Sequence, residues 1–193
     1  MPHKFDTRQR QRLLSEERYE ALHPESLLRD LGLKQGDTVA DIGSGPGFFT
    51  IPAAQIVGER GLVLAADVQG EMLSAVKGRV TEHGLTNVRV VKTSETDVPL
   101  PPESCDFVLL AFVLDEIEQR SRFLHRVARL LKPDGRIVVL EWNKEEQTEG
   151  PPIEDRISEE ELTADAQAAG LRISESRELN DHQYLCVLTS AKH

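Results

Sequence analysis

Hydrophobic and polar positions alternate along this chain from Asp37 onward, where short apolar runs are separated by segments of helical periodicity. Several runs, such as residues 108–111, are apolar at every position, which is typical of a parallel sheet covered on both faces. The expected strands are Thr38–Ile42, Leu62–Asp67, Val88–Val91, Phe107–Ala111 and Ile137–Glu141, and the expected helices lie near Phe48–Val57, Met72–Glu82 and Ser121–Leu130. Strands that alternate with helices predict a doubly wound α/β sheet with right-handed crossovers.

The two ends of the chain follow other patterns. Residues 1–32 are predicted to be helical, because Ser15 can cap a first helix and Pro24 suits the first turn of a second. Near the other end, Ser158–Glu161 forms a capping box that opens a helix. The strands that follow, Leu171–Leu179 and Tyr184–Thr189, are joined by a link too short for a crossover, so they must be antiparallel.

These patterns combine into one predicted domain over residues 1–193. It consists of an N-terminal helical segment (1–32), an alternating α/β core (33–142) and a C-terminal helix with an antiparallel hairpin (143–193). The expected fold is a Rossmann-like α/β sheet of seven strands, one of them reversed, with helices on both faces.

Composition narrows the class of protein. Of 193 residues, 39% are hydrophobic and 29% charged, as in a globular domain. The longest apolar run, residues 107–114, is far shorter than the roughly 18 residues that a membrane span needs. The N-terminus shows no secretory signal, and the two cysteines fit a reducing compartment without a metal site, so we expect a cytoplasmic protein. The net charge of −10 disfavours nucleic acids as partners.

Three glycines mark the turn between the first strand and the first helix of the alternating region. Gly43, Gly45 and Gly47 allow a tight turn and let a ligand approach bare backbone. Their spacing differs from that of dinucleotide binders, and Pro46 removes an N–H that a phosphate would need. Asp67 ends the second strand, where a carboxylate accepts hydrogen bonds from ribose hydroxyls. The pattern therefore favours a phosphate-free adenosine ligand.

Six segments together resemble the class I S-adenosylmethionine-dependent methyltransferases, in the group that includes enzymes of ubiquinone and menaquinone biosynthesis. They follow in family order within residues 25–142: Asp41–Gly47, Ala66–Val68, Glu71–Leu73, Val98–Pro101, Asp106–Ala111 and Leu130–Arg136. The resemblance implies methyl transfer from S-adenosylmethionine to a small-molecule acceptor.

The resemblance also implies roles for individual residues. The residues expected to bind the cofactor are Gly43, Ser44, Gly45 and Gly47 at its methionine part, Asp67 at the ribose, Ser94, Glu95 and Thr96 at the adenine, and Ala111 at the amino-acid end. Asp41 and Val68, which flank the glycine loop and Asp67 in the matched segments, are further expected cofactor contacts. In relatives the N-terminal segment covers the cofactor, so Phe5 and Tyr19 are candidate lid contacts, although a simple packing helix accounts for the segment equally well.

The acceptor is expected beyond the carboxyl ends of the parallel strands, where ligands bind in doubly wound sheets. Three segments meet there if the reversed strand lies beside the strand that ends at Glu141, as the family's sheet order implies. Candidate catalytic residues are His182, Asp115 and Glu141, and candidate acceptor contacts are Phe112, Glu116, Trp142 and Tyr184. Carboxylates and an indole suit a neutral or cationic acceptor, such as an amine.

Two other functions are compatible with parts of this pattern. A non-catalytic protein, for instance a sensor or an assembly factor, could use the same pocket to bind S-adenosylmethionine or S-adenosylhomocysteine. A nucleotide-dependent oxidoreductase would also need a glycine loop, but the glycine spacing and Pro46 argue against it.

Overall fold

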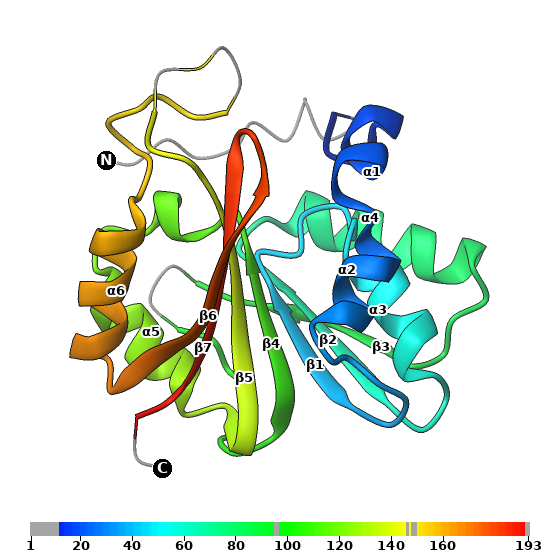
Figure 1. The fold of residues 1–193 in the computed structure, drawn as a ribbon. Helices are drawn as coiled ribbons and strands as arrows, with labels where there is room; N and C mark the ends of the chain where they lie inside the picture. The colour runs from blue at the N-terminus through cyan, green and yellow to red at the C-terminus, as the bar shows by residue number, and fades with distance from the viewer. Residues whose placement is uncertain (1–11, 95–96, 146, 148–149, 192–193) are drawn as a thin grey trace.

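The computed structural model describes residues 12–94, 97–145, 147 and 150–191, and its centre is a single seven-stranded sheet (Figure 1). The strand order is β3-β2-β1-β4-β5-β7-β6. The strands are β1 (Thr38–Ile42), β2 (Leu62–Asp67), β3 (Val88–Lys92), β4 (Cys105–Ala111), β5 (Leu131–Trp142), β6 (Leu171–Asn180) and β7 (Gln183–Ser190). All neighbours pair in parallel except that β7 runs antiparallel to both β5 and β6. The predicted sheet with one reversed strand is confirmed.

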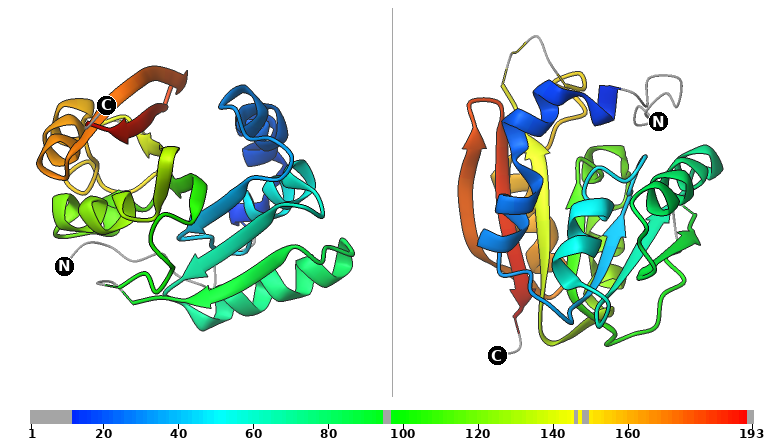
Figure 2. Two further views of the ribbon diagram at one scale, coloured as in Figure 1. Left: turned by 90° about the horizontal axis from the view of Figure 1, so that it is seen from below. Right: turned by 90° about the vertical axis from the view of Figure 1, so that its right-hand side faces the viewer.

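Helices cover both faces of this sheet (Figure 2). They are α1 (Glu16–Leu22), α2 (Pro24–Asp30), α3 (Thr50–Val57), α4 (Gly70–Glu82), α5 (Arg120–Ala128) and α6 (Glu159–Ala168), with short 3-10 turns η2 (Arg12–Leu14) and η3 (Leu114–Glu116). The predicted caps are present: the Ser15 hydroxyl accepts from the N–H of Arg18, and Ser158 and Glu161 form a reciprocal capping box. These side chains satisfy N–H groups that the first helical turn leaves without partners.

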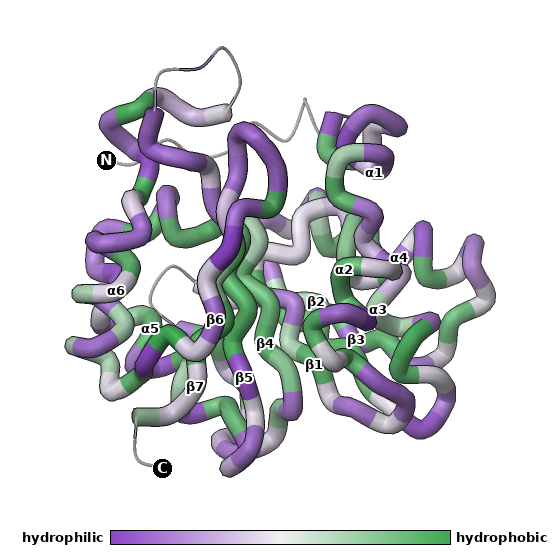
Figure 3. Tube along the Cα trace, viewed as in Figure 1, coloured by the Kyte–Doolittle hydropathy of each residue, from purple (hydrophilic) through white to green (hydrophobic). Residues whose placement is uncertain are grey.

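Successive residues of the central strands point to opposite faces and divide the core in two. Phe107 and Leu109 of β4 pack with α2 and α3, whereas Val108 and Leu110 pack with α5 and α6. This two-residue alternation is a property of extended backbone. Figure 3 shows the most hydrophobic residues concentrated along β1, β4 and β5, at the centre of the sheet.

Several predicted boundaries differ from the observed ones by one or more residues, and two of these differences have a clear structural reason. β5 begins at Leu131 rather than Ile137. Residues 132–135 interrupt its pairing with β4, since the register jumps from the pair Cys105–Leu131 to the pair Phe107–Arg136. α3 begins at Thr50, two positions after the predicted start, because the tight glycine loop extends to that point.

The reversed strand brings the β6–β7 turn to the carboxyl ends of the parallel strands. Trp142 pairs with Gln183, and the N–H of Asn143 donates to the carbonyl of His182 at 2.9 Å. The three segments predicted to meet at this edge therefore do so. No helix within the described part of the chain is long and apolar enough to cross a membrane.

Candidate active site

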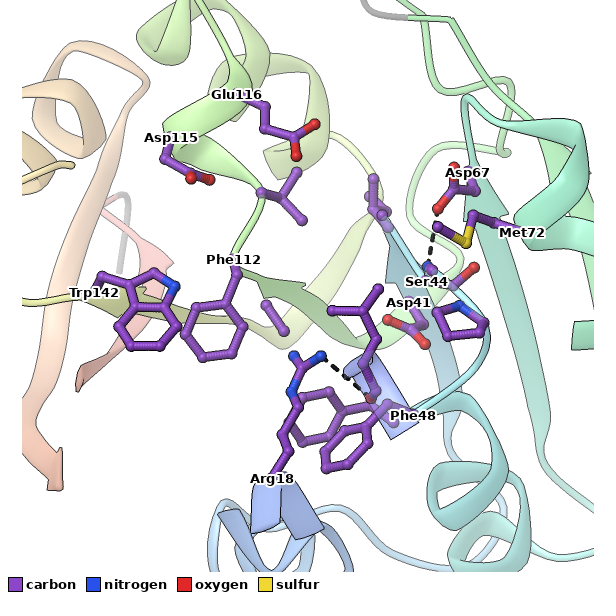
Figure 4. A pocket seen from close by; sticks show the side chains of 18 of the residues that line it. Arg18, Asp41, Ser44, Phe48, Asp67, Met72, Phe112, Asp115, Glu116 and Trp142 are labelled. Atoms are coloured by element: carbon purple, nitrogen blue, oxygen red, sulfur yellow. Dashed lines mark hydrogen bonds between the residues drawn. The ribbon is translucent and has the colours of Figure 1, made fainter. Parts of the chain in front are cut away.

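A cavity of about 1080 Å³ lies at the carboxyl ends of the parallel strands (Figure 4). Its walls come from the loop after β1, the ends of β2, β4 and β5, helix α1 and the β6–β7 turn. This volume is at the upper end of the range for ligand sites, roughly 300–1,000 Å³. The cavity therefore has room for more than one small ligand.

The glycine loop forms one wall, and its backbone requires glycine at several positions. Gly43, Gly45 and Gly47 have φ angles of +73°, +52° and +89°. A Cβ at Gly43 would lie 2.5 Å from a methyl group of Val113, so no side chain fits there without a shift. The positive φ angles and this close approach account for the glycines that the sequence has at these positions.

The N–H groups of this loop are used within the protein. Those of Gly43 and Ser44 donate to the carbonyl of Ala66 at 2.8 and 3.0 Å, and that of Gly45 donates to Oδ2 of Asp67 at 2.9 Å. A phosphate cradle needs such groups to point at the ligand. The loop geometry therefore supports the predicted phosphate-free ligand and argues against a dinucleotide.

Asp67 is held rigidly at the end of β2. Its Oδ1 accepts from the N–H of Gln69 at 2.8 Å, and its Oδ2 accepts from Gly45. Burial raises the pKa of Asp67, while these backbone hydrogen bonds act in the opposite direction. Together with the backbone of Val68, these groups still leave acceptor capacity on a carboxylate that has about four acceptor positions. Asp67 can therefore accept further hydrogen bonds from a diol in the cavity.

Asp41 lies deeper, at the end of β1, and is 2% exposed. Its Oδ2 accepts from the Thr50 hydroxyl at 2.5 Å. Burial raises its pKa from 3.8 to about 6; the Thr50 hydrogen bond opposes this rise, as does Arg18 more weakly, and the charge of Asp67 adds to it. A buried carboxylate in the cavity wall provides a negative potential for a cationic ligand.

The residues present fit S-adenosylmethionine. Ser44 lines the cavity, and its buried hydroxyl has no hydrogen-bond partner among the described residues. Such a group normally finds a partner, so a bound ligand is the natural one. Together with the oriented carboxylate of Asp67 and the glycine loop, this hydroxyl offers a polar lining without a phosphate site. Val68, Ser94 and Ala111 line the same cavity, whereas Glu95 and Thr96 lie outside the described residues.

The far end of the cavity gathers most of the predicted acceptor residues. The Phe112 ring, on a backbone with a φ of +60°, lies 5.6 Å from the Trp142 ring, centroid to centroid. Asp115 and Glu116 of η3 line the cavity beside them, and His182 lines it from the β6–β7 turn, where it is exposed. Figure 4 shows Asp115, Glu116, Phe112 and Trp142 on the side of the cavity opposite Asp67.

Glu141 and Tyr184 lie beneath this end rather than in its wall. Glu141 is 1% exposed, and its Oε1 accepts from the N–H groups of Val113 and Leu114 at 3.2 and 2.9 Å. Burial raises its pKa well above the ordinary value, and the charge of Asp115 adds to this. Tyr184 is 2% exposed, and its hydroxyl donates to the carbonyl of Ile157 at 2.9 Å.

The alternation of side chains between the two faces of β7 could have predicted that Tyr184 is buried. Tyr184 shares its face of the strand with Cys186 and Leu188, both of which belong to the core. The sequence-based assignment of Tyr184 as an acceptor contact is therefore corrected: it is a core residue with a satisfied hydroxyl.

The sequence analysis missed Arg18 and the two phenylalanines that follow Gly47. Arg18, Phe48 and Phe49 all line the cavity. Tyr19, one of the two candidate lid contacts, is 45% exposed; its hydroxyl bonds to Glu25, and its ring lies 6.4 Å from that of Phe48, centroid to centroid. Phe5, the other expected contact, lies outside the described residues. The direction of Arg18 follows from the packing of α1, which the helical pattern alone does not specify.

The sheet has this strand order, its glycine loop offers no phosphate-binding N–H groups, and a carboxylate lies at the end of β2. Together these features define the class of S-adenosylmethionine-dependent methyltransferases. The family model of the methyltransferase domain matches residues 40–139. A solved structure of a SAM-dependent methyltransferase from Aquifex aeolicus is 36% identical, with a TM-score of 0.91, over 96% of this chain and 98% of that one. The chain belongs to the methyltransferase domain family, and it is a SAM-dependent methyltransferase.

Other relatives are more distant or only partly covered. The ubiquinone/menaquinone biosynthesis C-methyltransferase UbiE of Azotobacter vinelandii is 36% identical over 114 residues, which are 58% of this chain and 45% of that protein. The chain thus spans about half the length of the curated relatives it matches. A putative type 11 methyltransferase from Sulfolobus solfataricus, at 21% identity and a TM-score of 0.74 over 88% of this chain and 93% of that one, shares the fold.

Proposed function

We propose that this methyltransferase acts on a neutral or cationic small molecule bound at the far end of the cavity, between Phe112, Trp142 and Asp115. The observation that carries the proposal is continuity: one cavity joins the glycine loop and Asp67 to these three residues. Carboxylates and aromatic rings together favour neutral or positively charged ligands over polyanions. The names of the curated relatives, C-methyltransferases of quinone biosynthesis, support a small-molecule acceptor.

The donor would occupy the other end of the cavity. Asp41, the glycine loop and Ser44 would border its methionine part, and Asp67 would accept from its ribose hydroxyls. Val68 and Ser94 would border the base, and Ala111 would lie at the amino-acid end. When bound, S-adenosylmethionine supplies an electrophilic methyl group on a sulfonium sulfur.

The main contribution of the protein is to position the two reactants. Holding reacting groups in the correct geometry supplies roughly 7–11 kcal/mol of barrier reduction. If the acceptor must lose a proton, Asp115 and His182 are the candidate bases because both line the cavity. Glu141 is a poorer candidate, since its Oε1 already accepts two backbone N–H groups below the cavity wall. We assign Glu141 a positioning role instead.

The donor site is tested by calorimetry with S-adenosylhomocysteine. Asp67→Asn keeps the shape of the side chain and removes its charge, so S-adenosylhomocysteine should bind about 10- to 100-fold more weakly, as expected for charge-assisted hydrogen bonds worth roughly 1.5–3 kcal/mol. Asp30→Asn, at an exposed position of α2, is the matched control and should bind as the wild type does. Equal affinities in all three proteins would show that Asp67 does not contact the donor.

The acceptor site is tested by turnover. A panel of amines, phenols, quinols and thiols is incubated with S-adenosylmethionine, and the release of S-adenosylhomocysteine is measured. With the best acceptor, Asp115→Asn and His182→Ala should change kcat or KM without changing the affinity for S-adenosylhomocysteine. Glu178→Gln, a change outside the cavity on β6, should have no effect. Unchanged kinetics in both cavity variants would contradict this acceptor site.

A further inference from the structure

Arg18 projects from α1 into the cavity between two aromatic rings (Figure 4). Its guanidinium carbon lies 4.6 Å from the centroid of the Phe48 ring and 5.3 Å from that of the Phe112 ring. Cation–π attraction to both rings stabilises the charge of the guanidinium at this position. The two rings therefore hold the head of the side chain inside the cavity.

Most of the hydrogen-bonding capacity of Arg18 remains open within the described part of the chain. A guanidinium has five N–H donors, and the hydrogen bond given for this one runs from Nη1 to the carbonyl of Leu13 at 3.3 Å. The described carboxylates form no ion pair with it, and Asp41 attracts it only at longer range. Arg18 is partly buried, and this burial lowers its pKa to about 10, so its charge is stabilised when an anion pairs with it.

Arg18 reaches Phe112 at the boundary between the two ends of the cavity, and its other contacts place it over the glycine loop. Phe48 directly follows Gly47 of the glycine loop. Leu13, whose carbonyl Arg18 contacts, lies over the same loop, because a Cβ built on Gly45 would be 3.6 Å from its Cδ1. Asp115 and Glu116, by contrast, lie across the cavity beyond Phe112. An anion bound by Arg18 therefore sits above the glycine loop, where the methionine part of the donor is proposed to lie.

We propose that Arg18 binds the α-carboxylate of S-adenosylmethionine and so fastens α1 over the methionine end of the donor. The planar fork of a guanidinium matches a carboxylate with two parallel hydrogen bonds. The pairing also neutralises a cation that would otherwise share the cavity with the positive sulfonium. This inference rests on the proposed placement of the donor along the glycine loop.

The test compares two ligands, one with and one without the amino-acid end of the donor. S-adenosylhomocysteine carries this end, whereas 5′-methylthioadenosine retains the adenosine and the thioether but lacks the amino-acid end, its carboxylate and its ammonium group included. Calorimetry is performed on the wild type, Arg18→Gln, Arg18→Lys and the matched control Arg29→Gln, which removes a positive charge from an exposed position of α2. Melting temperatures without ligand establish that each variant is folded.

The expected result is selective. Arg18→Gln should weaken S-adenosylhomocysteine binding about 10- to 100-fold and change 5′-methylthioadenosine binding less than twofold. Arg18→Lys should lose part of the affinity, because an ammonium lacks the fork, and Arg29→Gln should match the wild type. Hydrogen exchange in residues 12–22 should slow with S-adenosylhomocysteine and not with 5′-methylthioadenosine.

Two outcomes would overturn the role of Arg18. Unchanged S-adenosylhomocysteine affinity in Arg18→Gln would show that the carboxylate binds elsewhere, and equal weakening of both ligands would show that Arg18 only supports the fold of the cavity. If Asp67→Asn still weakens both ligands in either case, the donor site stands and only the inference on Arg18 fails. If the wild type binds neither ligand, both proposals fail.

Discussion

Replacing Asp41 by asparagine is expected to remove a pH-dependent cost to the folded state. Burial raises the pKa of Asp41 from 3.8 to about 6, so the folded state binds this proton more tightly than the unfolded state. The wild type therefore loses stability as the pH rises from about 4 to about 6 and keeps that loss at higher pH. At 1.36 kcal/mol per pKa unit, the full loss is about 3 kcal/mol.

The measurement is the free energy of unfolding in urea, for the wild type and Asp41→Asn, at several pH values between 5 and 8. Over that range the variant should gain about 1.4 kcal/mol relative to the wild type, roughly half of the full effect, and most of the gain should occur below pH 7. Asparagine can still accept the Thr50 hydroxyl, so any loss of that hydrogen bond adds an offset that does not vary with pH.

A difference between the two proteins that stays constant within about 0.5 kcal/mol from pH 5 to pH 8 would refute this reasoning. It would mean that Asp41 ionises in the folded protein as easily as in the unfolded chain. Thr50→Val is the informative companion: it removes the hydroxyl that lowers the pKa of Asp41, so the pH-dependent loss should become larger. A smaller loss in Thr50→Val would point to the same failure.

Two further substitutions separate the cavity wall from the core. Gly43→Ala should destabilise the fold by about 1–3 kcal/mol and weaken S-adenosylhomocysteine binding, because the φ of Gly43 is positive and an added Cβ would meet Val113. The control, Gly84→Ala, has a positive φ but open space around it, so it should destabilise the fold less. Equal melting temperatures of the two variants would contradict this. Tyr184→Phe should lower the free energy of unfolding in urea by about 1–3 kcal/mol, because the Ile157 carbonyl loses its donor. The affinity for S-adenosylhomocysteine should stay unchanged, and a weaker affinity would show that Tyr184 contributes to the cavity.

The sequence predicts the sheet well because its central strands are buried on both faces. Strands such as β2 and β4 carry apolar residues at nearly every position, and over so short a length that pattern is typical of a buried parallel strand. The start of β5 was harder, since Pro133, Asp134 and Gly135 indicate a turn. In the structure these residues form an irregularity inside the strand, and pairing with β4 exists on both sides of it. Turn chemistry is local, whereas the pairing that continues the strand around these residues depends on β4.

The candidate site was predictable where backbone geometry dictates the residue. Glycine is required at Gly43 by dihedral angle and close contact, so the sequence itself marks the loop. Arg18 had no such mark, because an arginine on an amphipathic helix normally faces solvent. Its position between Phe48 and Phe112 depends on how α1 folds back over the loop, which involves residues far apart in the chain.

Glu141 shows how the two ends of the cavity are joined. Its carboxylate, buried at the end of β5, accepts from the N–H groups of Val113 and Leu114 and so anchors the turn that follows β4. That turn holds Phe112 in a left-handed conformation and presses Val113 against Gly43. A non-glycine residue keeps such a conformation only when the contacts around it offset its conformational cost. The same buried acid thus supports both the aromatic wall at Phe112 and the glycine loop, which accounts for its burial.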